Sequence, residues 1–492
     1  MEKYIISLDQ GTTSCRTILF NQFGEIVDFE QQEFKQILPK KGWVEHDPLE
    51  IWETQLKTLT SLIKNNNLSH SQIEGVGITN QRETTVLWDK KTGKPVYNAI
   101  VWQDNRTIDF CNELKANDKE SLVKSKTGLV LDSYFSGSKI NWMLKNISGI
   151  NNLIENNQLL FGTIDTWLIW NLTKGAVHAT DVSNASRTLI FNINNLSWDE
   201  ELIQLFDIPK SILPEVKESS DNYGTWKWEG FEIPICGVAG DQQAALFGQC
   251  CHKIGMAKNT YGTGCFMLMN TGNKPVFSKN GLLTTIAWSM NGNVSYALEG
   301  SVFIAGAAIQ WLRDSLKIIS SAEESELMAD KSNDDGVVFV PAFSGLGAPY
   351  WDMQSKGAIF GLTRDTGINE ICKAALESLA LQSRDVILAM ERDADMKLKS
   401  LAVDGGACKN GFLMQFQADI LQTEVKRPLV IESTALGAAY LAGLYTGFYN
   451  MDNLSNNHKI AATFNSKMDE STRKLKTDLW KNAINSIINL HK

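Results

Sequence analysis

The stretch LDQGTTSCR, residues 8–16, follows the short apolar run YIIS at the start of the chain. Asp, Gly, Thr and Ser are ordinary turn residues, so a strand entering a hairpin would look much the same. The alternative is a ligand loop, in which Gly11 makes a tight turn and a row of small hydroxyl residues offers hydroxyls and backbone amides to phosphate oxygens: Thr12, Thr13 and Ser14. On this stretch alone both readings stay open.

The stretch matches neither of the common glycine-rich phosphate motifs. It lacks the lysine and the spacing of GxxxxGK[ST], and it has only Gly11 where GxGxxG needs three glycines. A P-loop kinase and a Rossmann dehydrogenase therefore lose most of their support. If the stretch is a phosphate cradle, Asp9 is placed to hold Mg²⁺ through water, and Arg16 is close enough to add positive charge.

A second glycine-rich stretch, LAVDGGACKN near residue 405, could also bind phosphate, from the other end of the chain. Gly405 and Gly406 allow close backbone approach, and a helix is predicted to start just after them. Two separated elements that grip one nucleotide imply two lobes with a cleft between them.

Strands and helices alternate along the chain. Several short runs rich in β-branched residues are followed by small or polar turn residues: YIISLD, IEGVGIT, ICGVAG, AKNTYG and LAVD. This pattern suggests sheets whose strand ends converge on a ligand. Apolar residues at three- and four-residue spacing predict helices from Pro48, Gly367 and Lys409, and a final packing helix near the C-terminus. This pattern predicts an α/β fold.

The bulk composition indicates a folded enzyme of about two large domains. We place the boundary near residue 248, which gives domains 1–248 and 249–492.

The formal charge of −9, with no basic run, argues against nucleic acid as a partner. The eight cysteines form no CxxC pair, the N-terminus lacks a signal-peptide core, and no stretch is long enough for a membrane span. A cytoplasmic protein without membrane insertion is expected.

Eleven stretches, in order between residues 4 and 445, resemble the FGGY family of carbohydrate kinases, in its bacterial glycerol kinase branch. They are DQGTTSCR, ITNQRETT, WQDNR, YFSGSKINWMLKN, GTIDTWLIWNLT, TDVSNASRT, GVAGDQQAALFGQ, NTYGTGCF, EGSVFIAGAAIQWLRD, FSGLGAPYWD and VDGGACKNGFLMQFQADIL. The resemblance implies two domains of the ribonuclease H-like, actin-like ATPase fold. It also implies transfer of the ATP γ-phosphoryl group to the 3-hydroxyl of glycerol, with Mg²⁺, and a homodimer or homotetramer.

The resemblance assigns the polyol site residue by residue. Arg82 and Glu83 match a glycerol-binding pair, in which a guanidinium donates to hydroxyls and a carboxylate accepts from them. Without the resemblance, the pair could be an exposed, salt-bridged strand end. Three aromatic residues match the positions that line the carbon face of glycerol: Trp102, Tyr134 and Phe266.

The catalytic and nucleotide residues follow from the same resemblance. Asp241 is the expected general base, with Arg82 in the catalytic set, Gln242 on the substrate and Asp9 sharing the metal with Asp241. The plainer alternative for Asp241 is a helix N-cap before QQAALFG. Beyond Thr12, Thr13, Ser14 and Arg16, the positions expected to contact ATP are Thr263, Gly306, Gln310, Gly405, Gly406 and Asn410.

The sequence departs from the family where some members are regulated. Some carry a Gly- and Arg-containing loop that binds fructose 1,6-bisphosphate, and others carry a histidine that the phosphotransferase system phosphorylates. Here the segment NYGTWKWEGFEIPICGVAGD contains neither arginine nor histidine. We therefore expect neither control to operate.

Two rival functions remain. Another FGGY kinase, acting on a different polyol or ketose, would share the nucleotide half but have a different sugar-facing set. A non-catalytic nucleotide switch of the actin or chaperone type would need neither the Arg82–Glu83 pair nor Asp241. The presence of Arg82, Glu83, Trp102, Tyr134 and Phe266 together favours glycerol over another polyol or ketose, and Asp241 with this pocket favours a kinase over a switch.

Overall fold

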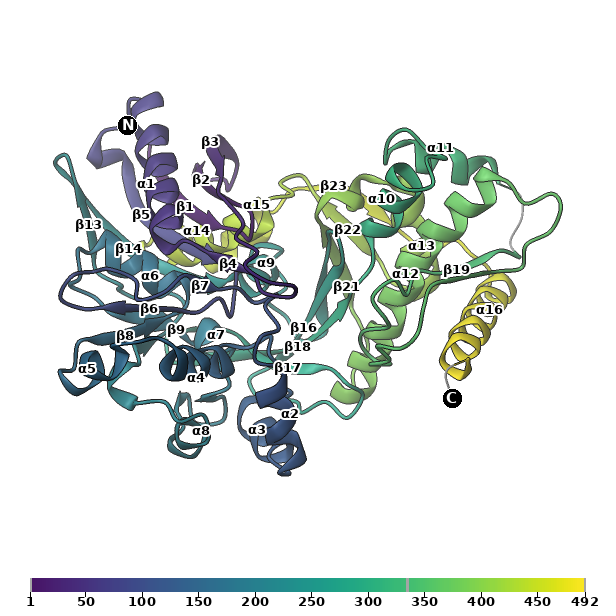
Figure 1. Cartoon of the computed structure of the whole chain (residues 1–492). Helices are drawn as coiled ribbons and strands as arrows, with labels where there is room; N and C mark the ends of the chain where they lie inside the picture. The colour runs from purple at the N-terminus through teal and green to yellow at the C-terminus, as the bar shows by residue number, and fades with distance from the viewer. Residues whose placement is uncertain (1, 333–335, 491–492) are drawn as a thin grey trace.

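The chain folds around two large mixed sheets, one in each half of the sequence, with helices packed around both (Figure 1). The structure is a computed structural model that describes residues 2–332 and 336–490. From edge to edge, the strands of the first sheet are β13 (Thr225–Trp228), β14 (Phe231–Gly240), β5 (Ile73–Asn80), β1 (Tyr4–Gln10), β2 (Ser14–Phe20) and β3 (Ile26–Glu33). Those of the second are β17 (Leu283–Met290), β18 (Asn293–Val302), β16 (Cys265–Gly272), β15 (Met256–Tyr261), β21 (Ser400–Asp404), β22 (Val425–Pro428) and β23 (Ile460–Phe464).

The two sheets share one plan. In the first, β1 pairs antiparallel with β2 and parallel with β5, which is parallel to β14. In the second, β15 pairs antiparallel with β16 and parallel with β21, which is parallel to β22. This repetition confirms the α/β prediction. The described residues also form small two-stranded sheets, which pair β4 (Glu45–His46) with β7 (Ala99–Ile100), β6 (Val86–Asp89) with β8 (Leu159–Gly162), β9 (Ala179–Asp181) with β12 (Glu215–Lys217), β10 (Phe191–Asn192) with β11 (Ser197–Trp198), and β19 (Val338–Val340) with β20 (Ala358–Phe360).

The predicted helices form at the expected places: α1 (Pro48–Asn65), α12 (Ile368–Ala394) and α13 (Gly411–Leu421). Asp47 caps α1 by accepting from the Leu49 amide, and proline follows as its first residue, where no amide hydrogen is needed. The remaining α-helices are α2 (Ile108–Ala116), α3 (Glu120–Thr127), α4 (Ser136–Asn146), α5 (Ile150–Glu155), α6 (Ile164–Leu172), α7 (Val182–Ala185), α8 (Glu200–Leu205), α9 (Asp241–Gly248), α10 (Gly306–Asp314), α11 (Glu324–Lys331), α14 (Ser433–Thr446), α15 (Met451–Asn457) and α16 (Glu470–Asn489).

The opening stretch is a β-hairpin. Strands β1 and β2 pair directly, and the Gly11 amide donates to the Ser14 carbonyl at 2.9 Å. The hairpin reading is therefore correct, and it does not exclude ligand contact, because Thr12 and Thr13 lie at the tip, partly or fully exposed.

Helix α14 returns from the second half of the sequence to pack on the first sheet (Figure 1). It contacts β1, β5, β14 and α9, and the approach is so close that glycine is needed on both sides. A Cβ atom on Gly77 would lie 2.2 Å from the Ala438 carbonyl oxygen, and one on Gly437 would lie 1.8 Å from that of Ala244. The chain thus closes on itself through one buried apolar cluster that contains residues of both halves.

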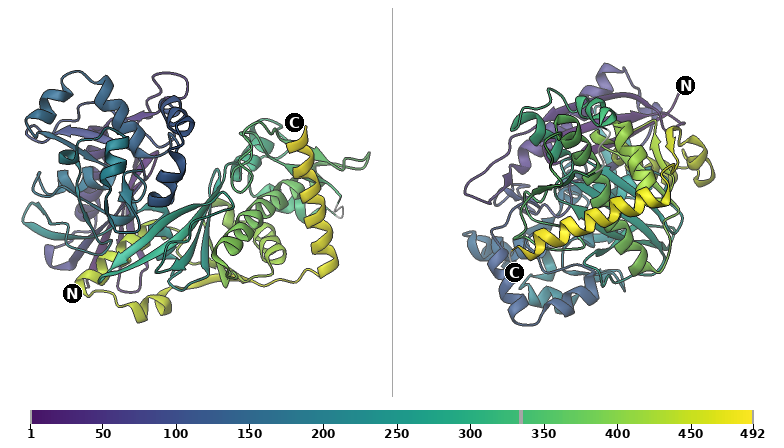
Figure 2. Two further views of the ribbon diagram at one scale, coloured as in Figure 1. Left: turned by 90° about the horizontal axis from the view of Figure 1, so that it is seen from below. Right: turned by 90° about the vertical axis from the view of Figure 1, so that its right-hand side faces the viewer.

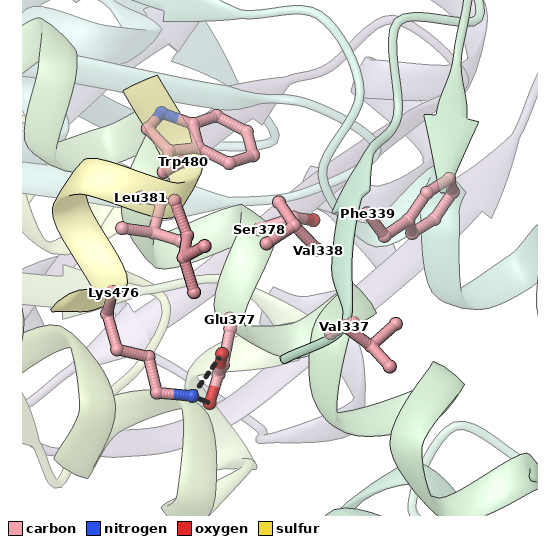
Figure 3. A pocket seen from close by; sticks show the side chains of 10 residues that line it. Val337, Val338, Phe339, Glu377, Ser378, Leu381, Lys476 and Trp480 are labelled. Atoms are coloured by element: carbon pink, nitrogen blue, oxygen red, sulfur yellow. Dashed lines mark hydrogen bonds and ion pairs between the residues drawn. The ribbon is translucent and has the colours of Figure 1, made fainter. Parts of the chain in front are cut away.

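The last helix, α16, lies across the outside of the second half (Figure 2). Lys476 donates to both carboxylate oxygens of Glu377 on α12, at 2.6 and 2.8 Å (Figure 3), and Trp480 Nε1 donates to Asp385 at 2.6 Å. The prediction of a final packing helix is confirmed. Across the described residues, the structure has no helix long and apolar enough to cross a membrane.

Candidate active site

The predicted catalytic residues gather at one edge of the first sheet. Strands β1, β5 and β14 are parallel neighbours, with Gln10 opposite Asn80 and Asn80 opposite Gly240. Asp9 lies near the end of β1, Arg82 and Glu83 follow β5 after one residue, and Asp241 directly follows β14. Carboxyl ends of adjacent parallel strands are the usual ligand-binding edge of an α/β sheet.

Behind these strand ends, four buried side chains alternate in charge. Arg187 Nε donates to Glu83 at 2.6 Å, and its Nη2 donates to Glu299 at 3.0 Å. Arg82 donates to the two oxygens of Glu299 at 2.5 and 3.2 Å. All four side chains are almost completely buried, so the reading of Arg82 and Glu83 as an exposed strand end is wrong.

Glu299 comes from β18 of the second sheet and stays ionised in this setting. Burial alone would raise the pKa of its carboxyl group, but Arg187 and Arg82 outweigh burial and hold the pKa at about 2. A carboxylate of the second half thus balances two guanidinium groups of the first.

Glu83 has an unusual backbone. Its φ is +60°, in the left-handed region that costs a side-chain-bearing residue free energy. The hydroxyls of Ser136 and Thr85 donate to the Glu83 carbonyl at 2.9 and 3.0 Å and help to hold this conformation. Strain held by its surroundings is a recurring property of binding sites.

Asp241 is the accessible carboxylate of the group. Its Oδ1 lies 3.0 Å from Arg82 Nε, and its side chain is 33% exposed, against 2% for Arg82. It is the first residue of α9 rather than its N-cap, which is Gly240, and Oδ1 accepts from the adjacent Gln242 amide at 2.7 Å. The side chain is therefore oriented by Arg82 and still open to a ligand.

Gln242 lies beside Asp241 and is held by a lysine of the second sheet. Lys258 Nζ donates to Gln242 Oε1, to Thr260 Oγ1 at 2.9 Å and to the Phe266 carbonyl at 3.1 Å. Burial lowers the pKa of Lys258 to about 8.

The predicted aromatic residues are only partly brought together. Trp102 and Tyr134 pack edge to face, with ring centroids 5.5 Å apart, and Trp102 Nε1 donates to Thr12 Oγ1 at 3.1 Å. Phe266 lies on β16, and its ring contacts neither of the other two. Tyr134 is anchored from behind, because the buried ammonium of Lys139 donates to the carbonyls of residues 133, 134 and 135.

The hairpin tip is joined to this group through Arg16. Arg16 donates to Asp9 at 2.5 Å and to Glu432, the residue just before α14. Ser14 Oγ accepts from Gln31 at 3.2 Å. The charge of Arg16, which the sequence assigns to phosphate oxygens, is thus shared here by two carboxylates.

Asp9 and Asp241 are the candidate metal ligands. Burial raises the pKa of Asp9, Arg16 opposes this, and the negative charges of Glu432 and Asp241 raise it further, so the two aspartates are close enough to interact. One or two carboxylates, completed by water and phosphate oxygens, are the donors that Mg²⁺ commonly takes, so the residues present fit this ion. Within residues 2–332 and 336–490, no cluster of three or more acidic, cysteine or histidine side chains could hold a metal alone.

Of the six nucleotide residues predicted in the second half, four lie near the ends of β15 and β21: Thr263, Gly306, Gly405 and Gly406. The amides of Ala305 and Ala307 donate to the Thr263 carbonyl at 2.9 and 3.1 Å, which ties the β15–β16 turn to the start of α10 at Gly306. Gly405 has φ +81°, and a Cβ atom there would lie 2.4 Å from the Tyr261 carbonyl oxygen. Gly406 faces open space.

The other two predicted nucleotide residues lie on the flanking helices. Gln310 is exposed on α10. Asn410 is the N-cap of α13, and its Oδ1 accepts from the Leu413 amide at 2.9 Å. Asn410 thus has a structural role whether or not it contacts a nucleotide.

Sequence reasoning missed four charged residues of this site: Arg187, Glu299, Lys258 and Lys139. Glu299 and Lys258 lie within strands that otherwise read as ordinary buried β-structure. The available signal was their charge, because Lys and Glu are almost never fully buried without a partner. Nothing in the sequence indicates which partner each would find.

Comparison with known proteins agrees with this geometry. Residues 4–248 match the model of the N-terminal domain of the FGGY family of carbohydrate kinases, and residues 257–445 match the model of its C-terminal domain. A glycerol kinase of Alkaliphilus metalliredigens is 57% identical over 99% of this chain and 98% of its own, and one of Brevibacillus brevis is 59% identical over 98% and 97%. The crystal structure of Plasmodium falciparum glycerol kinase with ADP superposes with a TM-score of 0.94 at 40% identity, covering 99% of this chain and 98% of that one. The chain belongs to the FGGY family of carbohydrate kinases.

Proposed function

We propose that this protein transfers the γ-phosphoryl group of ATP to the 3-hydroxyl of glycerol, giving sn-glycerol 3-phosphate and ADP. The observation that carries the proposal is the buried Arg82–Glu83 pair directly beside the accessible carboxylate of Asp241. A donor and an acceptor for hydroxyl groups next to a potential base are what a small polyol needs. Identity of nearly 60% to named glycerol kinases over almost the full length supports the same substrate.

In this proposal Asp241 is the general base. Arg82 holds Oδ1, which leaves the carboxylate able to accept the proton of the attacking hydroxyl. The hydroxyl oxygen forms a bond to the γ-phosphorus as the bond to the bridging oxygen of ADP breaks, and the proton passes to Asp241. In such reactions the protein mainly positions groups and neutralises charge, so Arg82 belongs to the catalytic set.

The phosphates are expected to lie between the two glycine-rich regions. The first-half contacts are Thr12, Thr13, Ser14 and Arg16, and the second-half contacts are Thr263, Gly306, Gln310, Gly405, Gly406 and Asn410. Asp9 and Asp241 would hold Mg²⁺, which neutralises charge on the phosphate oxygens when bound.

The apolar wall of the proposed polyol site is made by Trp102, Tyr134 and Phe266, with Gln242 as a polar contact.

We further propose two functional domains, 1–248 and 249–492. With ATP as phosphoryl donor, the expected location is the cytoplasm. A homodimer or homotetramer, expected from the family resemblance, can be tested by light scattering of the purified protein.

We propose that neither known family control acts here. The segment that would carry them forms the β13–β14 hairpin, where Trp226 stacks on Trp228 at 5.6 Å between ring centroids. Fructose 1,6-bisphosphate added to the assay should leave the rate unchanged, and strong inhibition would refute the proposal.

The test of the main proposal is a substrate panel with MgATP, in which ADP release is measured with glycerol, other polyols, pentuloses and hexuloses. Turnover that depends on glycerol, with sn-glycerol 3-phosphate as product, is expected. Preference for a ketose or another polyol would assign a different FGGY kinase activity. ATP turnover that is indifferent to every polyol would favour a nucleotide switch.

A further inference from the structure

Lys258 is a fully buried lysine held by three neutral acceptors. Its ammonium group has three N–H donors, and the described structure gives it three partners: Gln242 Oε1, Thr260 Oγ1 and the Phe266 carbonyl. Among the described residues, the carboxylates of Asp404, Asp241 and Glu299 act on Lys258 through their charge and not through a hydrogen bond to its ammonium group. A buried charge without a directly paired counter-ion is costly, so its position needs a reason beyond packing.

The contact with Lys258 determines which way the Gln242 amide faces. An ammonium group only donates, so Gln242 must turn its oxygen toward Lys258 and its NH₂ group away. Within the described part of the chain Nε2 has no hydrogen-bond partner, and the side chain is only partly buried. Gln242 therefore offers a free donor next to the accessible acceptor Asp241.

We infer that Lys258 is a positioning residue that fixes the donor end of the Gln242 amide toward the polyol. The inference rests on the proposed function and adds a prediction about which ligand groups the site accepts. The position facing Gln242 accepts a ligand oxygen with a free lone pair and rejects a protonated amine, which can only donate. Lys258 acts from the second sheet, so the two halves together set this preference.

The first test is Lys258→Met, which keeps the length of the side chain and removes its donors. With the amide free to rotate, we expect the glycerol KM to rise about 3- to 10-fold, the value of one ordinary hydrogen bond. The KM for ATP should change less than twofold. Lys476→Met is the matched control, because it also removes a buried lysine but lies on α16 on the outside of the second half, and its glycerol KM should match wild type.

A double-mutant cycle separates positioning from general structural damage. If Lys258 acts through Gln242, Lys258→Met should hardly change the glycerol KM in a Gln242→Ala background. Independent, additive effects of the two substitutions, or an equal rise in both KM values, would overturn the inference.

Gln242→Glu gives a test that does not depend on the stability of the lysine variant. The new carboxylate keeps a contact with Lys258 but presents an acceptor in place of the donor. We expect kcat/KM for glycerol to fall, and the ratio of 2-amino-1,3-propanediol to glycerol activity to rise about tenfold. An unchanged ratio would contradict the inference. If the substrate panel shows that the wild type uses another polyol, the same cycle is run on that polyol and its amino analogue, so the two proposals fail separately.

Discussion

Asp241 combines exposure with a fixed orientation, which is the arrangement a general base requires. For Asp241→Asn we expect kcat to fall about 10²- to 10⁴-fold, the usual contribution of a positioned proton acceptor. The glycerol KM should change far less, because Arg82 and Glu83 remain. Steady-state kinetics and a thermal melt check this, and wild-type turnover in a folded variant would rule out the assigned role.

Glu299 is the acidic centre of the buried charge network. Among the described residues, Glu299→Gln leaves Glu83 as the one fully buried counter-ion of Arg82 and Arg187, so we expect a loss of about 3–5 kcal/mol in the free energy of unfolding. Urea unfolding measures this loss. The control is Glu232→Gln, which breaks an ion pair with Lys227 on the surface and should have little effect. Equal stabilities of the two variants would contradict the importance of the network.

Lys258 also predicts a pH dependence. Burial lowers its pKa from the ordinary 10.5 to about 8, with Asp404, Asp241, Arg82 and Glu299 as the charged groups around it. Between pH 8 and 10.5 the unfolded chain keeps this proton and the native state has lost it. The destabilising effect of the buried charge is therefore fully present below pH 8 and is relieved as the pH rises toward 10.5.

The same titration should be visible in function. Above pH 8 the neutral amine no longer provides three donors, so the glycerol KM of the wild type should rise between pH 7 and 9.5. Lys258→Met lacks this group, and its glycerol KM should stay flat over the range. Parallel profiles for the two proteins would show that another group is responsible.

At the scale of elements, the sequence was a good guide to local structure. The helix from Pro48, the strand that contains Asp9 near its end and the strand just before Asp241 are confirmed, because periodicity and caps act over a few neighbouring residues. The Arg82–Glu299 contact spans 217 positions, and no local pattern encodes which distant strand supplies a partner. The return of α14 to the first sheet was missed for the same reason.

Helix α14 connects the fold to catalysis, because it packs directly on α9, the helix that begins at Asp241. In Gly437→Ala the new methyl group would meet the Ala244 carbonyl, so we expect a loss of about 1–3 kcal/mol in stability and a lower kcat from a displaced α9. Gly367→Ala is the control, since its Cβ would meet nothing closer than 3.5 Å. Thermal unfolding and kcat of both variants are the measurements, and a neutral Gly437→Ala would contradict the close packing.

At the scale of the whole molecule, the proposed substrates meet where the two halves are already joined. Several polar contacts cross between the sheets at this place, among them Arg82 with Glu299, Gln242 with Lys258 and Gln249 with Asp404. Each contact brings a residue on or beside the catalytic edge to a strand of the second sheet. A ligand that orders one half should therefore also favour the arrangement of the other.

This predicts cooperative stabilisation by the two ligands. Glycerol and a non-hydrolysable ATP analogue with Mg²⁺ should each raise the melting temperature, and together they should raise it by more than the sum of the separate shifts, because each then binds a molecule that the other has already ordered. Calorimetry at saturating ligand measures the surplus. In Glu299→Gln, where one contact between the halves is weakened, the surplus should shrink although each ligand alone still binds. Strictly additive shifts in the wild type would mean that the two halves bind their ligands independently.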